Sequence, residues 1–210
     1  MREARIRGIL VDLDETLHSR EAAFWAWIES EAERVGKSAT LDRARIAELD
    51  ARGRGEKEPL LGYLDEVFGW AECGEQRVER FRAGVSRFAK LGPGVRELLV
   101  RLGAEYRLGL VTNGTSATQR AKLSSLGIER LFDPIVISGE VGVRKPDARI
   151  FELAMAGWGL PRESILFVGD DPVSDIQGAM NAGMRTLRVG GDDGIASFTM
   201  LEAWLQRRSA

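Results

Sequence analysis

Five short strand-like segments, four of them predominantly apolar and all separated by stretches with helical periodicity, constrain the fold of this chain more than any other feature of its sequence. They occupy residues 9–11, 106–111, 134–137, 165–168 and 185–189. Strands that alternate with helices form βαβ units, in which the strands are parallel and helices cover both faces of the sheet. We therefore predict an α/β protein with a Rossmann-like, doubly wound parallel sheet, built from residues 1–17 and 91–210.

Apolar spacing and end signals mark the helices between these runs. After the turn at residues 92–94, apolar residues recur at the i, i+3, i+4 and i+7 positions of an amphipathic helix: Val95, Leu98, Leu99 and Leu102. Further helices are expected at residues 116–126, 147–157 and 175–182. Gly127 and Gly183 are placed to end the first and last of these, and Asp147 is placed to cap the start of the second.

Residues 18–90 differ from the rest because they show helical stretches and no strand pattern. The stretches cover about residues 21–35, 41–51, 59–68 and 75–89. Apolar side chains recur along the first and the last of them at helical intervals, which indicates packed faces. Trp25, Trp27 and Trp70 are expected to belong to this core. We predict an all-helical domain inserted after the first strand.

Two carboxylates, Asp12 and Asp14, follow the first apolar run and lie two positions apart. Residues two apart in a strand point to the same face, so the two charges would repel each other. A bound cation relieves this repulsion, and Mg²⁺ prefers oxygen ligands of this kind. A strand end with two solvated acids is the alternative for this segment alone.

Polar residues suited to catalysis also follow the other predicted strands. Thr112 ends the second run, Lys145 precedes the 147–157 helix, and the pair Asp170-Asp171 follows the fourth run. In a doubly wound sheet the carboxyl ends of the parallel strands share one edge, where such folds bind ligands. We therefore expect the whole set to form one site, an order and placement that unrelated solvated loops do not explain.

The segments DLDETL, VTNG, VGVRKPD and VGDDPVSD, in this order, resemble the four motifs of the haloacid dehalogenase-like (HAD) hydrolase superfamily. The motif positions are Asp12, Asp14 and Thr16 in the first, Thr112 in the second, Lys145 in the third, and Asp170 and Asp175 in the fourth. The resemblance extends over the whole chain, because the helical insertion at residues 18–90 looks like the C1 cap of the family's phosphatases.

The resemblance implies a role for each residue that meets the substrate. Asp12 would attack phosphorus and form an aspartyl-phosphate. Asp14 would protonate the leaving-group oxygen and later take a proton from the attacking water. Thr112, with the backbone N–H groups of Asn113 and Gly114, would bind the phosphoryl oxygens.

The same resemblance implies a metal site and a charged partner for the nucleophile. Asp12, Asp170 and the main-chain carbonyl of Asp14 would hold Mg²⁺, with Asp175 close by. Lys145 would bind the substrate phosphate and neutralise charge on the nucleophile and on the transferring phosphoryl group.

The intact motifs imply a Mg²⁺-dependent phosphatase that hydrolyses a small phosphorylated metabolite, a nucleotide or a sugar phosphate. Asp14 favours phosphoryl transfer over dehalogenation, because the dehalogenases that this chain resembles lack an acid at that position. Two alternatives stay open from sequence: a phosphomutase of the same fold, and a non-catalytic sensor of a phosphorylated ligand.

Composition limits the partners and the compartment. The net charge of −2 gives no overall attraction to nucleic acid or to an anionic membrane. Cys73 is the one cysteine, so no internal disulfide can form and a reducing compartment fits best. No apolar run approaches about 18 residues, the length that spans a membrane. We expect a cytoplasmic protein, monomeric or homodimeric, that binds neither nucleic acid nor membrane.

Two residues beside the motifs have more than one interpretation. His18 follows the first motif directly, where the chain enters the helical insertion. It lies either near the substrate, at the hinge between cap and core, or, as we expect, on the surface of the linker that joins them. Asp171 either supports the metal site or caps the helix that follows it.

Overall fold

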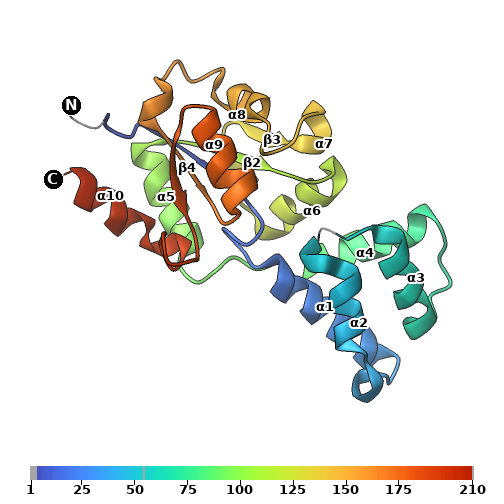
Figure 1. The fold of residues 1–210 in the computed structure, drawn as a ribbon. Helices are drawn as coiled ribbons and strands as arrows, with labels where there is room; N and C mark the ends of the chain where they lie inside the picture. The colour runs from blue at the N-terminus through green and yellow to red at the C-terminus, as the bar shows by residue number, and fades with distance from the viewer. Residues whose placement is uncertain (1–3, 54, 210) are drawn as a thin grey trace. The chain divides into compact units, whose positions relative to one another are not determined.

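The computed structural model describes residues 4–53 and 55–209 and contains a parallel five-stranded sheet (Figure 1). The strands are β1 (Gly8–Val11), β2 (Arg107–Thr112), β3 (Ile135–Ile137), β4 (Ile165–Gly169) and β5 (Arg185–Arg188). Their order across the sheet is β3-β2-β1-β4-β5, and β1 is buried along its whole length. The α/β class and the doubly wound parallel sheet predicted from the sequence are confirmed.

The strand order reverses direction between β1 and β4. The chain moves one way across the sheet from β1 through β2 to β3, crosses back, and moves the other way from β4 to β5. Because crossovers between parallel strands are right-handed, the connecting helices lie on opposite faces before and after the reversal. Such sheets bind ligands outside the carboxyl ends of the strands at this point, so the fold singles out the residues that follow β1 and β4.

The chain divides into two compact units, Met1–Ser19 with Lys90–Ala210, and Arg20–Ala89. The helices of the first unit are α5 (Val95–Glu105), α6 (Ser116–Leu126), α7 (Ser138–Val141), α8 (Ala148–Met155), α9 (Gly178–Asn181) and α10 (Leu201–Ser209). The side chains that α5 buries are the four that its spacing predicts. Gly127 ends α6 with a positive φ of 65°, and the Asp147 side chain caps α8, as predicted.

One of two elements late in the chain differs from the sequence prediction. The helix expected at 175–182 begins earlier, as a π-helical segment, Pro172–Gln177, that leads into α9. It starts early because the Asp171 side chain accepts hydrogen bonds from two N–H groups of its first turn. The strand expected at residues 185–189 is β5, which lies at the edge of the sheet, and only Leu187 of its four side chains is buried.

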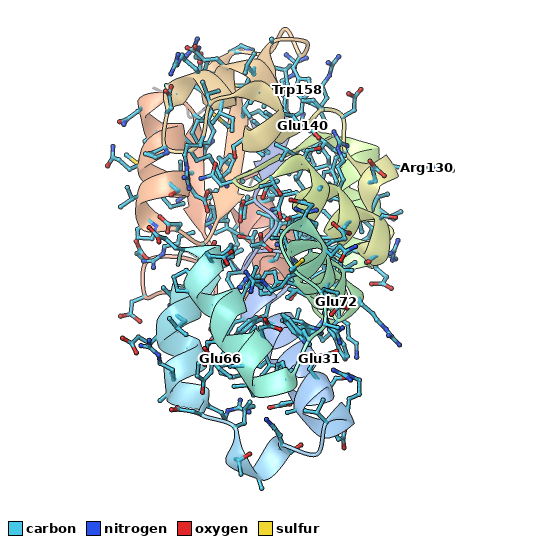
Figure 2. All side chains as sticks on the ribbon, turned by 90° about the vertical axis from the view of Figure 1, so that its right-hand side faces the viewer. Glu31, Glu66, Glu72, Arg130, Glu140 and Trp158 are labelled. Carbon is cyan, nitrogen blue, oxygen red and sulfur yellow. The ribbon has the colours of Figure 1, made fainter. Side chains whose placement is uncertain are left out.

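A continuous apolar core holds α8 and α9 against the sheet and thereby fixes the ends of β1 and β4. Phe151 of α8 and Phe167 of β4 are fully buried and stack edge to face, with ring centroids 5.1 Å apart. Trp158, labelled in Figure 2, joins the same core and donates a hydrogen bond from its ring N–H to the carbonyl oxygen of Asp133. This packing makes the carboxyl edge of the sheet a rigid base for polar side chains.

In its described residues, 20–53 and 55–89, the second unit holds the helices α1 (Arg20–Arg34), α2 (Arg43–Asp50), α3 (Lys57–Phe68) and α4 (Glu75–Arg87). Trp27 and Trp70 are core residues as predicted, whereas Trp25 is half-buried. Glu31 and Glu72, labelled in Figure 2, both bind the guanidinium group of Arg80. Across both described ranges of the chain, no helix is long and apolar enough to cross a membrane.

Candidate active site

Four of the residues predicted from the sequence motifs meet beyond the carboxyl ends of β1 and β4. Lys145 Nζ lies 2.5 Å from Asp12 Oδ1 and 2.7 Å from Asp175 Oδ1. One carboxylate oxygen from each of Asp12, Asp170 and Asp175 lies within 4.8 Å of the others. Asp12, Lys145 and Asp175 are buried, and Asp170 is half-buried. The fold thus brings Asp12 into contact with a lysine 133 positions later in the chain.

The side chain of Asn113 fixes the loop that carries Lys145. Asn113 Nδ2 donates to the carbonyl oxygen of Lys145 over 3.0 Å, and the N–H of Lys145 donates to Asn113 Oδ1 over 2.9 Å. Because Asn113 directly follows β2, this pair of bonds ties the second motif to the third. The phosphate contact predicted for Asn113 uses its backbone N–H, which takes no part in the pair.

The π-helical segment places Asp175 over the end of β4. The N–H of Asp171 donates to Asp175 Oδ2 over 3.1 Å, while the Asp171 side chain caps the segment, which is one of the two roles expected for it. A Cβ atom on Gly169 would lie 2.3 Å from Asp175 Oδ2. Only glycine therefore leaves room for the carboxylate, which gives a physical reason for the glycine that precedes Asp170.

The three carboxylates carry more negative charge than the ammonium of Lys145 neutralises. Burial holds the pKa of Asp12 well above its ordinary value, and the opposing charge of Lys145 does not offset it. Burial, with the charge of Asp175, raises the pKa of Asp170 to about 6. Although burial acts to lower the pKa of Lys145, the charges of Asp12 and Asp175 raise it, so the lysine stays protonated.

This donor set fits a hard divalent cation. Carboxylate oxygens are the side-chain ligands that Mg²⁺ prefers, and the three oxygens are close enough to share one ion. A cation would also counter the burial and the repulsion by Asp175 that together raise the pKa values of Asp12 and Asp170.

The carboxylate of Asp14 lies in a second cluster, with partners that the sequence prediction did not include. Lys122 Nζ is 2.6 Å from one oxygen of Asp14 and 2.7 Å from the other. His18 Nε2 lies 2.9 Å from Oδ1, and Gln119 Nε2 donates to Oδ2 over 3.1 Å. Burial acts to raise the pKa of Asp14, but Lys122 and His18 outweigh it and hold the pKa well below its ordinary value.

Thr112 and Gly114, predicted to bind phosphate, lie at the end of β2 and just beyond it. Gln119 Nε2 donates to Thr112 Oγ1 over 2.6 Å, so the hydroxyl hydrogen of Thr112 can still be donated to a ligand. The N–H of Gly114 donates to Ser138 Oγ over 3.0 Å, so a phosphate contact would have to replace that bond. The φ of Gly114 is 151°, and a Cβ there would lie 2.9 Å from the Gln119 side chain.

The expectation that His18 is a surface residue of the linker is wrong. Its side chain is fully buried because it binds Asp14, and its backbone pairs with Leu91. Lys122 and Gln119 are also buried and are missing from the sequence prediction. A signal was present, because the buried face of α6 has the spacing of an apolar stripe and two of its members are polar: Gln119, Lys122, Leu123 and Leu126.

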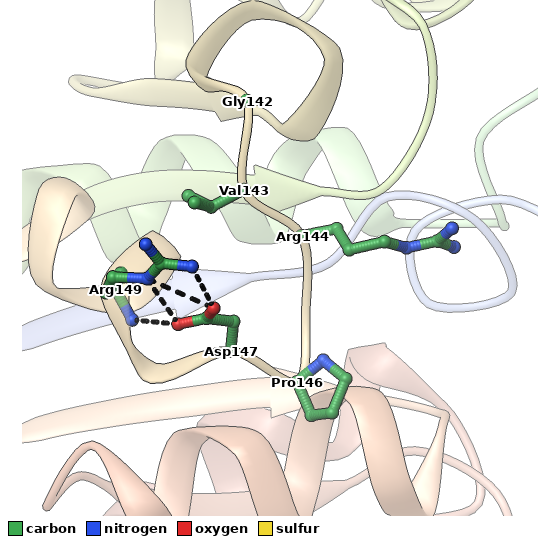
Figure 3. Close-up of a pocket in the computed structure, with 6 residues that line it drawn as sticks. All are labelled: Gly142, Val143, Arg144, Pro146, Asp147 and Arg149. Atoms are coloured by element: carbon green, nitrogen blue, oxygen red, sulfur yellow. Dashed lines mark hydrogen bonds and ion pairs between the residues drawn. The ribbon is translucent and has the colours of Figure 1, made fainter.

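An open depression of about 520 Å³ lies beside the Lys145 loop (Figure 3). The residues that line it are Gly142, Val143, Arg144, Pro146, Asp147 and Arg149. In Figure 3, Arg149 is bonded to Asp147, and Arg144 points away from this pair. The Lys145 ammonium binds Asp12 and is not part of the lining, so the depression is separate from the carboxylate cluster.

The sequence and the fold of this chain are similar to those of known proteins. The family model described as haloacid dehalogenase-like hydrolase matches residues 9–189. The glyceraldehyde 3-phosphate phosphatase of Methanopyrus kandleri is 44% identical over 208 residues, which covers 88% of this chain and 84% of that protein. The pyrimidine 5'-nucleotidase YjjG of Escherichia coli is 44% identical over 95 residues, only 45% of this chain and 42% of that protein. The solved structure of the HAD-hydrolase YfnB from Bacillus subtilis has a TM-score of 0.77 at 23% identity, covering 97% of this chain and 100% of that chain.

Proposed function

The chain belongs to the haloacid dehalogenase-like hydrolases and is an enzyme of their phosphatase class, and we propose that it hydrolyses small-molecule phosphate monoesters with the help of Mg²⁺. One observation carries the proposal. Lys145 joins Asp12 and Asp175 beside Asp170, in a cluster whose excess negative charge suits a divalent cation. A nucleophile, an ammonium group and a cation at one sheet edge are what the transfer of an anionic phosphoryl group requires.

Asp12 is the proposed nucleophile and Asp14 the proposed acid and base. A carboxylate oxygen of Asp12 forms a bond to phosphorus as the bond between phosphorus and the leaving oxygen breaks. Asp14, which Lys122 and His18 hold as a carboxylate in the substrate-free protein, takes up a proton as the anionic substrate binds and gives it to the leaving oxygen. In the second step, water attacks phosphorus and gives a proton to Asp14. The aspartyl-phosphate bond breaks, which releases inorganic phosphate and restores Asp12.

Thr112 and Lys145 are proposed to bind the phosphoryl oxygens. The Thr112 hydroxyl can donate to them because Gln119 occupies its oxygen only as a donor. Lys145 already contacts Asp12, so its charge would stabilise both the nucleophile and the transferring group. The backbone N–H groups of Asn113 and Gly114 would complete the phosphate site.

Asp12, Asp170 and the main-chain carbonyl of Asp14 are proposed to hold the Mg²⁺, with Asp175 close by. When bound, the ion would shield the anionic nucleophile from the anionic substrate. Lys145 and the N–H of Asp171 hold Asp175 in place beside these ligands.

Residues 18–90 are proposed to act as a cap over a catalytic core formed by residues 1–17 and 91–210. Such a cap opens to admit substrate and closes to exclude water. We propose a nucleotide or a sugar phosphate as substrate. One relative is a pyrimidine 5'-nucleotidase and another a glyceraldehyde 3-phosphate phosphatase, and these names support the choice.

Phosphate release tests the proposed function. The panel contains p-nitrophenyl phosphate, a pyrimidine nucleoside monophosphate, glyceraldehyde 3-phosphate and a hexose phosphate, each with Mg²⁺ and with EDTA. Asp12→Asn is expected to abolish turnover while the protein still folds, because the two side chains have the same shape. Asp133→Asn is the matched control, because Asp133 is exposed and precedes β3, and it is expected to keep the wild-type rate.

Release that persists in EDTA or in Asp12→Asn would contradict the proposal. A phosphomutase would give a different result, because it moves the phosphoryl group to a second hydroxyl of the sugar and free phosphate does not accumulate.

A further inference from the structure

We propose that Lys122 is a positioning residue for Asp14, and that Gln119 links the Asp14 carboxylate to Thr112. The inference rests on the proposed function, because it concerns how the acid–base carboxylate of that reaction is held. Lys122 touches neither substrate nor metal in this account and acts through Asp14 alone.

The ammonium of Lys122 lies almost equally close to both oxygens of the Asp14 carboxylate, at 2.6 and 2.7 Å. The side chain of Lys122 is 5% exposed, whereas that of Asp14 is 27% exposed. Burying an ammonium group is costly unless it is paired, so the side chain of Lys122 is stable here because of Asp14. The lysine therefore holds the carboxylate from the protein interior and leaves its accessible part for a ligand.

Gln119 extends this arrangement to the end of β2. Its Nε2 donates to Asp14 Oδ2 over 3.1 Å and to Thr112 Oγ1 over 2.6 Å, so one amide group joins the acid to the phosphate-binding hydroxyl. Gln119 and Lys122 are one turn apart on α6, and the start of that helix is fixed by the Thr115 side-chain cap. The helix therefore fixes the positions of Gln119 and Lys122 relative to each other.

His18 gives Asp14 a third contact, which keeps the fold tolerant of changes at Lys122. His18 Nε2 lies 2.9 Å from Asp14 Oδ1, and the backbone of His18 pairs with both Asp14 and Leu91. Replacing Lys122 therefore leaves Asp14 with two partners and partial access to water, so it does not create an isolated buried charge.

Proton transfer depends on the orientation that Lys122 provides. A general acid must lie within hydrogen-bond reach of the leaving oxygen, and such catalysis contributes about 10²–10⁴-fold to the rate. Without Lys122, the Asp14 carboxylate keeps its contacts with His18 and Gln119 but loses the ammonium that offsets its repulsion by Asp12 two residues earlier, so its orientation is less firmly fixed. We expect the loss to fall on steps that move a proton through Asp14 and to spare steps that do not.

Leaving groups of different basicity distinguish this role from a structural one. Lys122→Met keeps the unbranched apolar part of the side chain and removes its charged ammonium group. Rapid mixing with p-nitrophenyl phosphate measures the first step without an acid, because nitrophenolate departs unprotonated. For Lys122→Met we expect a nitrophenolate burst close to the wild-type rate, followed by slow turnover. Cleavage of an alkyl phosphate is expected to fall about 100-fold, and Lys122→Arg is expected to restore most of it.

A double-mutant comparison tests whether Lys122 acts through Asp14. Adding Lys122→Met to Asp14→Asn is expected to cost no further activity, because the group that Lys122 orients is already gone. Lys37→Met, at an exposed lysine of the second unit, is the matched control and is expected to leave all rates unchanged.

The outcomes separate the inference from the proposed function. If the wild-type protein releases no phosphate, the proposed function itself is overturned. An active wild type with Lys122→Met slowed equally in the burst and in later steps, or not slowed at all, would overturn the role of Lys122. Additive losses in the double variant would do the same.

Gln119→Met is a second variant that keeps the Lys122 ion pair and so does not depend on the folding of Lys122→Met. It is expected to raise KM, because Thr112 loses its hydrogen-bond donor, and to slow alkyl phosphate cleavage. Unchanged KM and kcat would refute the link through Gln119.

Discussion

Replacing Gly169 by alanine tests the placement of Asp175 beside the proposed cation site. A Cβ at residue 169 would lie 2.3 Å from Asp175 Oδ2 and 2.5 Å from its Cγ. Real Cβ atoms essentially never approach a neighbour closer than 3.0 Å, so the carboxylate must move by about 0.7 Å or more. That shift would weaken its ion pair with Lys145 and its hydrogen bond from the Asp171 N–H.

We expect Gly169→Ala to lower the affinity for Mg²⁺ about 10–100-fold, the usual effect of disturbing the groups that orient metal ligands. Overpacking of this kind also costs about 1–3 kcal/mol of stability. Calorimetric titration of the metal-free protein with Mg²⁺ measures the first effect, and thermal unfolding without metal measures the second.

Gly157→Ala is the matched control, because nothing lies within 4 Å of a Cβ at that position and its φ is not positive. It is expected to leave the Mg²⁺ affinity unchanged. An unchanged affinity in Gly169→Ala would refute the reasoning, because Asp175 would then have no part in holding the cation.

Three further predictions concern the cation site and the two packed cores. Because protons compete with the cation for Asp170, whose pKa is raised to about 6, Mg²⁺ affinity should be lower at about pH 5 than at about pH 7.5; an affinity independent of pH would contradict this. Phe151→Ala should lower the free energy of unfolding, measured in urea, by about 3–5 kcal/mol, since Phe151 is fully buried against Phe167. A loss below about 1 kcal/mol would contradict this, because it would mean that neighbouring side chains close the cavity. Asp50→Ala should destabilise the second unit by about 3–5 kcal/mol in thermal unfolding, because it leaves the buried Arg20 unpaired, and adding Arg20→Met should recover most of this loss.

The positions of strands and helices could be predicted where the pattern of buried apolar residues repeats along the sequence of the element itself. The strand β1 is buried on both faces, and α5 buries the apolar residues that its spacing marks. The π-helical start before α9 could not be predicted, because it depends on which backbone groups the Asp171 side chain caps. The edge position of β5 depends on the strand order, which local periodicity does not contain.

Some residues of the candidate site could likewise be predicted from the sequence, and others could not. Asp12, Lys145 and Asp170 could be expected near one another because each lies by the carboxyl end of a predicted strand or before a helix, and parallel strands bring these ends together. The partners of Asp14 could not, because Lys122 lies 108 positions away and reaches Asp14 only through the packing of α6. A lysine within an apolar helical stripe is a sign of such a buried contact, although it does not identify the partner.

The transfer of a phosphoryl group to Asp12 is the central claim of this account. The most direct measurement is to stop turnover with acid, reduce the protein with borohydride and map the modified residue by mass spectrometry, since an acyl phosphate is reduced whereas a free carboxylate is not. The account predicts that residue 12 alone is converted to homoserine, only when substrate and Mg²⁺ are both present, and that Asp12→Asn shows no modification. Phosphate release with an unmodified Asp12, or with the modification at another residue, would contradict it.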